Sequence, residues 1–384
     1  MMRYTTAGES HGRALTAIVT HVPAGVPVNA EDIDRDLARR QGGYGRGGRQ
    51  KIESDRVSIL SGVRFGRTIG SPIALGVANR DWENWLDIMA VAGDAPEGMR
   101  VTAPRPGHAD LAGVLKIDSH DTRDILERAS ARETAARVAA GGIAKAFLRA
   151  VGVEVRSYVE AIGSVRMASA STIAGIDWAA AEASAVSCPD AEATEAMKIL
   201  IDNARADGES LGGVFVVTAT GLVPGLGTYA EPDRRVDAGL AAALMSIPAI
   251  KGVEIGDGFS AAGVVGSLAH DAIFHDNERG YYRETNRAGG LEGGMTNGEP
   301  LVVRVAMKPI PTLMRPLASV DIDSHEAIDA SKERSDVCAV PAAAVVGEAE
   351  VAFVLARAYL DKFGSDTLTD ILGARDAYLT RISR

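Results

Sequence analysis

Glycine is distributed unevenly along this chain, and its clusters limit where helices and strands can form. The 384 residues include 42 glycines, about 11% against the ~7% that is usual for globular proteins. Five fall within residues 289–298, and five more fall within residues 37–51. Because regular secondary structure tolerates such a density poorly, we expect an irregular loop at 289–298 whose backbone lies close to another group.

Between the glycine clusters, helical and strand-like segments alternate irregularly. Asn29 can cap a helix that ends near Arg40, before Gly42. A long alanine-rich helix is predicted over residues 122–150, followed by helices at 190–206, 232–246, 342–362 and 366–382. Runs of β-branched residues predict strands at 57–63, 151–159, 214–221 and 301–307. The pattern indicates an α/β or α+β fold, which we expect to be a single large domain, residues 1–384, with long functional loops.

Composition and missing motifs exclude several classes of protein. A net charge of −10 argues against general binding of nucleic acid. The N-terminus lacks the apolar segment of a signal peptide, and no apolar run approaches the ~18 residues of a membrane span. The two cysteines, Cys188 and Cys338, are expected to be buried, unpaired and in the cytoplasm. We find no Rossmann fingerprint and no GxxxxGK(S/T) phosphate loop, and we expect no metal site.

Residues 37–51 carry five cations and no acid, in a chain that is acidic overall. The cations are Arg39, Arg40, Arg46, Arg49 and Lys51. Glycines expose backbone N–H groups, and forked guanidinium groups suit phosphate or carboxylate. We favour a mobile loop that closes on a multiply anionic small molecule. An RGG-like contact with nucleic acid and a merely solvated basic loop are the alternatives.

Two short turns each present a histidine that could act in general acid–base chemistry. In residues 8–12, GESHG, flanking glycines let His11 stand exposed. In residues 105–110, RPGHAD, a proline restrains the entry to His108, and Asp110 could orient the ring or simply close the turn. Either turn alone is more often structural than catalytic.

A further candidate lies inside the predicted 122–150 helix. Arg128 and Arg132 are four residues apart and share a face, as do Ser130 and Thr134. Two arginines beside two hydroxyls suit a phosphate, although arginines on an exposed helix are usually only solvated.

Two other segments are weak signals when taken alone. Residues 308–312, KPIPT, leave a predicted strand as a stiff turn. Arg334 and Asp336 place a cation and a carboxylate together ahead of a helix. With the histidine turns and the glycine-rich loops, these segments describe one large arginine-rich site assembled from many loops.

Seven motifs, in this order, resemble the chorismate synthase family across nearly the whole chain. They are GESHG (8–12), RPGHAD (105–110), ERASARETAARVAAG (127–141), MSIPAIKGVEIGDGF (245–259), TNRAGGLEGGMTNG (285–298), KPIPT (308–312) and RSDVC (334–338). The resemblance implies a β-α-β sandwich of the α+β class. It also implies the 1,4-anti elimination of phosphate from 5-enolpyruvylshikimate 3-phosphate, which gives chorismate and requires reduced FMN (FMNH2) without net redox change. Ile117 stands where the family usually has tyrosine, which puts a local packing or substrate-edge contact in doubt.

The resemblance also implies roles for individual residues. His11 would protonate the departing phosphate, His108 would hold the flavin in its productive protonation state, and Asp336 would help to take the ring proton. The substrate would be bound by Ser10, Arg40, Arg46, Arg49, Arg105 and Arg132. FMN would be bound by Arg128, Ala129, Ser130, Pro248, Ala249, Gly293, Lys308, Pro309, Ile310, Pro311, Thr312 and Arg334. Because Arg40 and Arg46 match positions usually assigned to the NADP phosphate, they could hold either NADPH or the substrate.

The family's homotetramer would fit a site to which Pro248 and Ala249 come from a neighbouring subunit. Whether the enzyme reduces its own FMN with NADPH or takes up reduced flavin is left open by these residues. Two other functions are the alternatives: a flavin oxidoreductase that performs net hydride transfer in the same pocket, and an RNA-binding protein that uses residues 37–51.

Overall fold

The N-terminal strands form a four-stranded antiparallel sheet. Its order is β1 (Arg3–Ala7), β2 (Ala14–Thr20), β6 (Ile73–Ala78) and β3 (Val57–Ile59). The computed structural model describes residues 1–47, 54–93, 98–168, 173–332 and 336–383. β2 and β6 alternate buried and less buried residues, so one face of this sheet contributes to the core.

A second antiparallel sheet has five strands. Its order is β10 (Ile250–Ile255), β15 (Leu301–Met307), β9 (Gly213–Thr220), β7 (Glu154–Ile162) and β8 (Val165–Arg166). β15 begins and ends where the sequence predicts a strand, whereas β7 begins three residues later than predicted. Most residues of β9 and β15 are buried on both faces.

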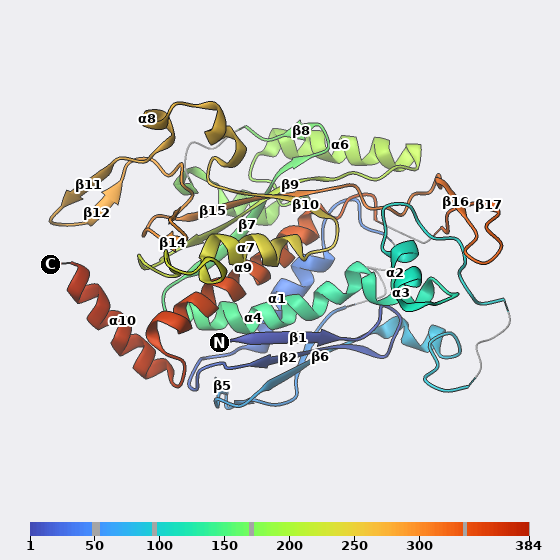
Figure 1. Ribbon diagram of the computed structural model, residues 1–384, viewed down its shortest axis with the longest axis horizontal. Coiled ribbons are helices and arrows are strands. Elements are labelled where there is room, and N and C mark those ends of the chain that lie inside the picture. The colour runs from blue at the N-terminus through green and yellow to red at the C-terminus, as the bar shows by residue number, and fades with distance from the viewer. Residues whose placement is uncertain (48–53, 94–97, 169–172, 333–335, 384) are drawn as a thin grey trace.

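Helices lie between the two sheets. Figure 1 shows α1 (Ala30–Gln41), α4 (Thr134–Ala150) and α9 (Val340–Phe363) there, with α7 (Val236–Met245) beside α9. α4 packs against β2 and β6, and α9 packs against β7 and β9. The two helices approach closely because Gly141 has no Cβ, which would lie 2.3 Å from the Cβ of Ala349. One cluster of buried apolar residues extends across both sheets and these helices.

A buried carboxylate ties these central helices together. Glu348 of α9 accepts two hydrogen bonds from Arg39 of α1, at 2.7 and 2.9 Å, and one from Lys145 of α4 at 2.7 Å. Burial opposes the ionisation of Glu348, but the charges of Lys145 and Arg39 outweigh it and lower the pKa of Glu348 to about 2. This network fixes the position of α1, whose last turn carries Arg40.

The remaining elements are short or peripheral. The helices are α2 (Asp110–Ile117), α3 (Arg123–Ala129), α5 (Trp178–Ala183), α6 (Ala191–Asp207), α8 (Gly266–Ala269) and α10 (Leu368–Ile382). The two-stranded pairs are β4 (Val63–Arg64) with β5 (Arg67–Thr68), β11 (Ile273–Asp276) with β12 (Gly280–Arg283), β13 (Leu291–Glu292) with β14 (Met295–Thr296), and β16 (Ala318–Val320) with β17 (Ala327–Asp329). Among the described residues, no helix combines the length and apolar composition that crossing a membrane requires.

The structure corrects the prediction of one long helix over residues 122–150. α3 ends at Ala129, Ser130 is extended with ψ 143°, and a 3₁₀ turn precedes α4. The Ser130 hydroxyl accepts the backbone N–H of Arg132 at 3.3 Å, so it caps the new turn. This local hydrogen bond competes with the continuous helix that periodicity predicts.

The structure also corrects the prediction of a wholly irregular loop at 289–298. Residues 291–296 form the small β13–β14 hairpin. Gly293 and Gly294 have φ values of +59° and +85°, the positive angles that a tight two-residue hairpin turn requires. The glycine density that argued against strands thus supplies the turn of a short hairpin.

Candidate active site

Two connections leave the same end of the four-stranded sheet and form one wall of the candidate site. The turn at residues 8–12 joins β1 to β2, and a 3₁₀ helix, Arg80–Trp85, follows β6. Buried Asn79 links them, because its side-chain amide donates to two carbonyl oxygens of the 8–12 turn, at 3.2 and 2.6 Å. α3 closes the wall, since the Ser10 N–H donates to the backbone oxygen of Glu127 at 2.9 Å. Figure 1 shows this end of the sheet beside α3.

His11 is buried in this wall between a carboxylate and an indole. Its Nδ1 lies 2.9 and 3.0 Å from the two carboxylate oxygens of Glu127, which also accepts the His11 backbone N–H at 2.9 Å. The Trp85 ring stacks on the imidazole with centroids 3.7 Å apart. Burial opposes the ionisation of Glu127, but the hydrogen bonds and charge of His11 outweigh it and lower the pKa of Glu127. The expectation of an exposed His11 is wrong, because side chains distant in sequence cover it.

The break at Ser130 separates the two arginines that were predicted to share a helix face. Arg128 is exposed and donates to backbone oxygens of β1 and the turn after it, at 3.0 and 3.1 Å. Arg132, in contrast, is buried. The Ser130 hydroxyl donates to the Ser10 hydroxyl at 3.2 Å, and Ala129 ends α3 beside it. The predicted phosphate site with two arginines on one face is therefore wrong.

Arg132 and Arg40 both contact the buried carboxylate of Asp55. Nη1 of Arg132 donates to both Asp55 oxygens at 2.7 Å, and Nη1 of Arg40 lies 3.6 Å from one of them. Arg40 also donates to the Thr134 hydroxyl at 2.9 Å and to the Ala131 carbonyl oxygen at 2.8 Å. The 3₁₀ turn before α4 and the end of α1 therefore hold two arginines around one acid.

The glycine-rich basic loop adds Arg46 to this group. Its Nη1 donates to one Asp336 oxygen at 2.5 Å, and the Gly47 N–H donates to the other at 2.7 Å. The carbonyl oxygen of Gly45 accepts the Val337 N–H at 2.7 Å. The described end of the predicted mobile loop is thus hydrogen-bonded to the segment before α9. Three residues predicted for this region lie outside the described residues: Arg49, Lys51 and Arg334.

Among the described residues, this arginine cluster has more cations than carboxylates. Arg40, Arg46 and Arg132 contact Asp55 and Asp336. Burial and the charges of the other two arginines lower the pKa of Arg40 to about 9. A buried excess of cations is suited to an anionic ligand.

The second histidine is also held by a carboxylate. His108 Nδ1 lies 2.5 Å from one oxygen of Asp110, and Arg105 Nε donates to the other at 2.8 Å. Burial opposes the ionisation of Asp110, but hydrogen bonds from His108 and Arg105 hold its pKa well below the ordinary range. Asp110 therefore orients the ring, as one of the two predicted alternatives has it. Arg105 also donates to the Thr312 hydroxyl at 3.3 Å, and Ile117, at the end of α2, is exposed.

The turn after β15 meets the turn that carries His108. Lys308 Nζ donates to the Gly107 carbonyl oxygen at 3.0 Å, and the Lys308 backbone N–H donates to the Ala249 carbonyl oxygen at 2.9 Å. Partial burial and the charge of Lys251 lower the pKa of Lys308. Lys308 and Ala249 are in contact within one chain. Any site that contains one of these residues therefore contains the other from the same subunit. The adjoining predicted residues are Pro248, Pro309, Ile310 and Pro311.

One predicted residue lies apart from the histidines. Gly293 is in the turn of the β13–β14 hairpin, where a bridge joins Met295 to Gly227. Figure 1 shows β14 toward the opposite end of the molecule from α2 and α3. Within a single chain, the structure does not bring Gly293 together with His11 or His108.

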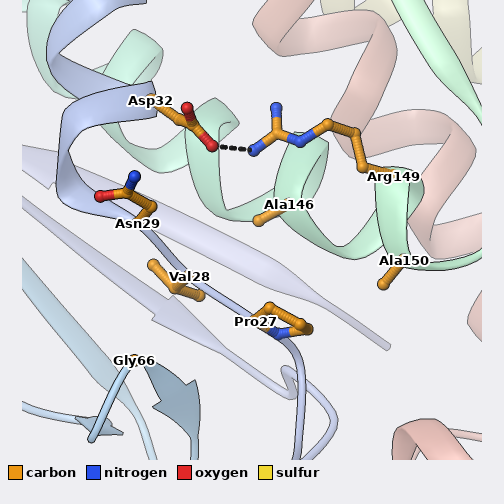
Figure 2. Close-up of a pocket in the computed structure, with 8 residues that line it drawn as sticks. All are labelled: Pro27, Val28, Asn29, Asp32, Gly66, Ala146, Arg149 and Ala150. Carbon is orange, nitrogen blue, oxygen red and sulfur yellow. Dashed lines mark hydrogen bonds and ion pairs between the residues drawn. The ribbon is translucent and has the colours of Figure 1, made fainter.

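A surface pocket of about 350 Å³ lies between the start of α1 and the end of α4 (Figure 2). Asp32 and Arg149 form an ion pair in it at 3.1 Å. The other lining residues are Pro27, Val28, Asn29, Gly66, Ala146 and Ala150. None of these eight residues is a predicted site residue, so we do not assign the pocket to the candidate site.

Four residues of this geometry escape sequence reasoning. Glu127 begins the 127–134 segment, and an acid so close to two arginines could have been recognised as a candidate site residue. Asp55, Asn79 and Trp85 belong to no recognisable pattern, and only long-range packing reveals their contacts.

Comparisons with known proteins agree across the whole chain. A sequence profile of the chorismate synthase family matches residues 2–360. A chorismate synthase from Desulforudis audaxviator (strain MP104C) is 59% identical over 383 residues, which is 100% of this chain and 98% of the relative. One from Symbiobacterium thermophilum (strain DSM 24528) is 59% identical over 393 residues and 100% of both chains. A crystal structure of chorismate synthase matches with a TM-score of 0.81 and 43% identity, over 100% of this chain and 98% of the other.

Proposed function

The chain belongs to the chorismate synthase family, and from that premise we propose how its residues carry out the family's reaction. The enzyme is a carbon–oxygen lyase that acts on a phosphate ester. It converts 5-enolpyruvylshikimate 3-phosphate into chorismate by 1,4-anti elimination of phosphate, without net redox change. The observation that carries the residue assignments is the largely buried cluster in which, among the described residues, three arginines surround two aspartates.

The arginine cluster binds the substrate. The substrate carries one phosphate and two carboxylates, and buried guanidinium groups bind such groups by paired, charge-assisted hydrogen bonds. We assign this role to Arg40, Arg46 and Arg132, helped by the Ser10 hydroxyl and by Arg49. Arg105, which the resemblance also assigns to the substrate, lies beside His108, and we propose it for the flavin instead. Asp55 holds Arg132 and Arg40 in place before the substrate arrives.

His11 protonates the departing phosphate. Glu127 holds its Nδ1, so a protonated ring donates to the leaving group from Nε2. Asp336 helps to remove the ring proton, and its carboxylate is fixed by Arg46 and by the Gly47 N–H. His11 and Asp336 approach the arginine cluster from different elements. This suits a reaction in which phosphate and a ring proton leave different positions of one substrate.

The donors around His108 fit reduced FMN. Arg105, His108, Lys308 and Thr312 supply cations and hydrogen-bond donors in one region, and such a set suits a flavin phosphate and the polar edge of its ring. The same site would be lined by Arg128, Ala129, Ser130, Pro248, Ala249, the 308–312 turn and Arg334. When bound, reduced flavin lends electron density to the allylic system as phosphate leaves. His108 holds the proton that keeps the bound flavin in its productive state, and Asp110 fixes the ring that does so.

NADPH remains a reductant that the enzyme could use directly. Arg40 and Arg46 are the residues proposed for its phosphate, yet Arg40 is only 5% exposed and already bonded to Thr134 and Ala131. That burial favours the substrate over a nicotinamide nucleotide at Arg40. An aerobic assay with NADPH, FMN and substrate, but no added reductase, tests the point, because product forms only if the enzyme reduces its own flavin.

We further propose a cytoplasmic homotetramer built from single-domain subunits of the β-α-β sandwich type. Two buried, unpaired cysteines support a reducing compartment. Residues 258–283 expose several large apolar side chains, including Phe259, Val265, Ile273 and Tyr281, which supports burial against another subunit. Gly293 would then meet the flavin of a neighbouring subunit. Sedimentation equilibrium tests the tetramer, and a monomer at micromolar concentration would contradict it.

An anaerobic turnover assay tests the proposed chemistry. Phosphate release should match chorismate formation, and reduced FMN should not be consumed; stoichiometric oxidation of the flavin would indicate net hydride transfer instead. His11→Gln and His108→Gln should each lower turnover about 100-fold or more. His21→Gln, a change at an exposed histidine, is the matched control. Near-normal turnover in either site variant removes that residue from the mechanism.

A further inference from the structure

The stacking of Trp85 on His11 joins two elements that are 74 residues apart in sequence, counted from 11 to 85. The ring centroids are 3.7 Å apart and the planes are inclined by 22°. This is face-to-face contact over most of the imidazole. Glu127 holds Nδ1 in the plane of the same ring. One edge and one face of His11 are therefore fixed by different elements.

Trp85 is itself held in place. Its indole N–H donates to an Asp81 oxygen at 3.1 Å, and the Asn84 amide donates to the other oxygen at 2.9 Å. The guanidinium of Arg123 lies 5.3 Å from the centroid of the indole and donates to Glu127 at 3.2 Å. Arg123 thus contacts both groups that hold His11, and a preorganised set of this kind is what precise proton transfer needs.

We propose that Trp85 is a positioning residue for His11: its stacked indole holds the imidazole so that Nε2 faces the leaving phosphate, and its π-face stabilises the protonated ring. The inference rests on the proposed role of His11 as proton donor. The hydrogen bond at Nδ1 leaves the ring some freedom to tilt, and the stacked indole limits that motion. The electron-rich face of an indole attracts a cation, so the contact favours the state that donates the proton.

Charged groups that the structure describes in this wall also bear on any pH dependence. They are Glu127 and Arg123 from α3, Asp81 from the 3₁₀ helix, Glu9 from the 8–12 turn, and Arg132, which donates to Asn79. All of them remain when Trp85 is replaced by phenylalanine or leucine. Differences between those variants therefore report on the stacked ring.

Tryptophan fluorescence tests the contact without using the reaction. A protonated imidazole in contact with an excited indole quenches it by accepting an electron, and a neutral imidazole does so poorly. The chain has three tryptophans: Trp82, Trp85 and Trp178. In wild-type enzyme, emission should be lower in the state in which His11 is protonated, which acid pH favours. His11→Gln and Trp85→Phe should each abolish that decrease, whereas Trp82→Phe and Trp178→Phe should keep it.

Turnover tests the consequence for catalysis. Trp85→Leu should lower kcat by about 3- to 10-fold with little change in KM, the range expected for one aromatic or cation–π contact. Trp85→Phe, which keeps a stacking ring, should restore most of the loss. A pH-dependent quench that survives in Trp85→Phe, or full kcat in Trp85→Leu, overturns the inference. Full activity in His11→Gln would instead contradict the proposed role of His11 as proton donor. The fluorescence measurement would still test the contact between Trp85 and His11.

Discussion

Replacing Arg40 by methionine should stabilise the free enzyme while it damages activity. Arg40 is buried, and it is one of three arginines that surround two carboxylates among the described residues. In Arg40→Met, two arginines and two aspartates of this cluster remain among the described residues. Methionine is apolar and reaches about as far as the arginine Nε, so it fills part of the space without a charge that must be buried.

The size of the effect follows from the surroundings of Arg40. Its pKa falls from the ordinary 12.5 to about 9, which corresponds to a cost of roughly 5 kcal/mol for the buried charge. Its two hydrogen bonds, to Thr134 and Ala131, return about 1.5 kcal/mol each. Neither acceptor is stranded, because the Thr134 hydroxyl itself donates to the Ala131 oxygen at 2.6 Å. The variant should therefore gain about 2 kcal/mol in the free energy of unfolding.

Urea denaturation of the apoenzyme at pH 7 measures this difference. Arg35→Met is the matched control, since Arg35 lies on the same helix with a side chain that is 70% exposed. That control should change the unfolding free energy by no more than about 0.5 kcal/mol. kcat/KM of Arg40→Met should fall about 10- to 100-fold, because a charge-assisted contact with the substrate is lost. Substrate should raise the unfolding midpoint of wild type more than that of the variant.

The pH dependence has a defined sign. A cation whose pKa is lowered on folding costs stability while it stays charged, and the cost disappears as pH rises from the folded value toward the unfolded one. The advantage of Arg40→Met should therefore be largest below pH 9 and should shrink between pH 9 and 10.5. A variant that is less stable than wild type by 1 kcal/mol or more at pH 7 would refute the reasoning, since Arg40 would then be a net stabilising residue.

Three other changes test separate parts of the structure. Asp110→Asn should lower kcat about 10- to 100-fold. Because the pKa of Asp110 is lowered on folding, the wild type should lose stability as the pH falls below about 4, and the variant should lose less; equal acid sensitivity of both proteins would contradict this. Asp336→Asn should lower kcat at least 10-fold with normal folding by circular dichroism, and unchanged kcat would exclude proton transfer at Asp336. Gly113→Val should destabilise the protein by about 1–3 kcal/mol, because a Cβ at Gly113 would lie 2.5 Å from Cγ2 of Ile125 between α2 and α3. The urea midpoint should therefore fall, and an unchanged midpoint would show that these helices can separate.

Local signals in the sequence predicted the elements well where one residue decides the boundary. Asn29 accepts the Glu31 N–H and begins α1 as predicted, and Leu301–Met307 is a strand over its full predicted length. The break at Ser130 was missed because the apolar periodicity continues through it. There the choice is made by one serine hydroxyl, and by contacts that bury Arg132 against Asp55. Periodicity measures a preference for helix, and it does not register a long-range ion pair that favours the break.

The sequence marks candidate site residues one by one, but it predicts few of the contacts between them. His108 and Asp110 are two residues apart, so their pairing was foreseeable. Arg46 and Asp336 are 290 residues apart, and the sequence could mark both without showing that they meet. The acids that hold the arginines are the residues most easily missed, because a lone aspartate such as Asp55 has no pattern of its own. Their positions depend on how two sheets and three helices pack, which local sequence does not specify.

Both candidate histidines have the same arrangement, and it constrains what each can do. An acid holds Nδ1 in each, Glu127 for His11 and Asp110 for His108. A carboxylate at Nδ1 keeps a proton there, so the neutral ring has a lone pair at Nε2 and the protonated ring has an N–H at Nε2. His11 can therefore give a proton to phosphate from Nε2 only from its protonated state, and turnover limited by that step must fall as the ring is deprotonated. The carboxylate at Nδ1 thus determines that His11 donates its proton on the acid side of the pH–rate profile. The stacked ring of Trp85 determines whether Nε2 faces the phosphate in that state.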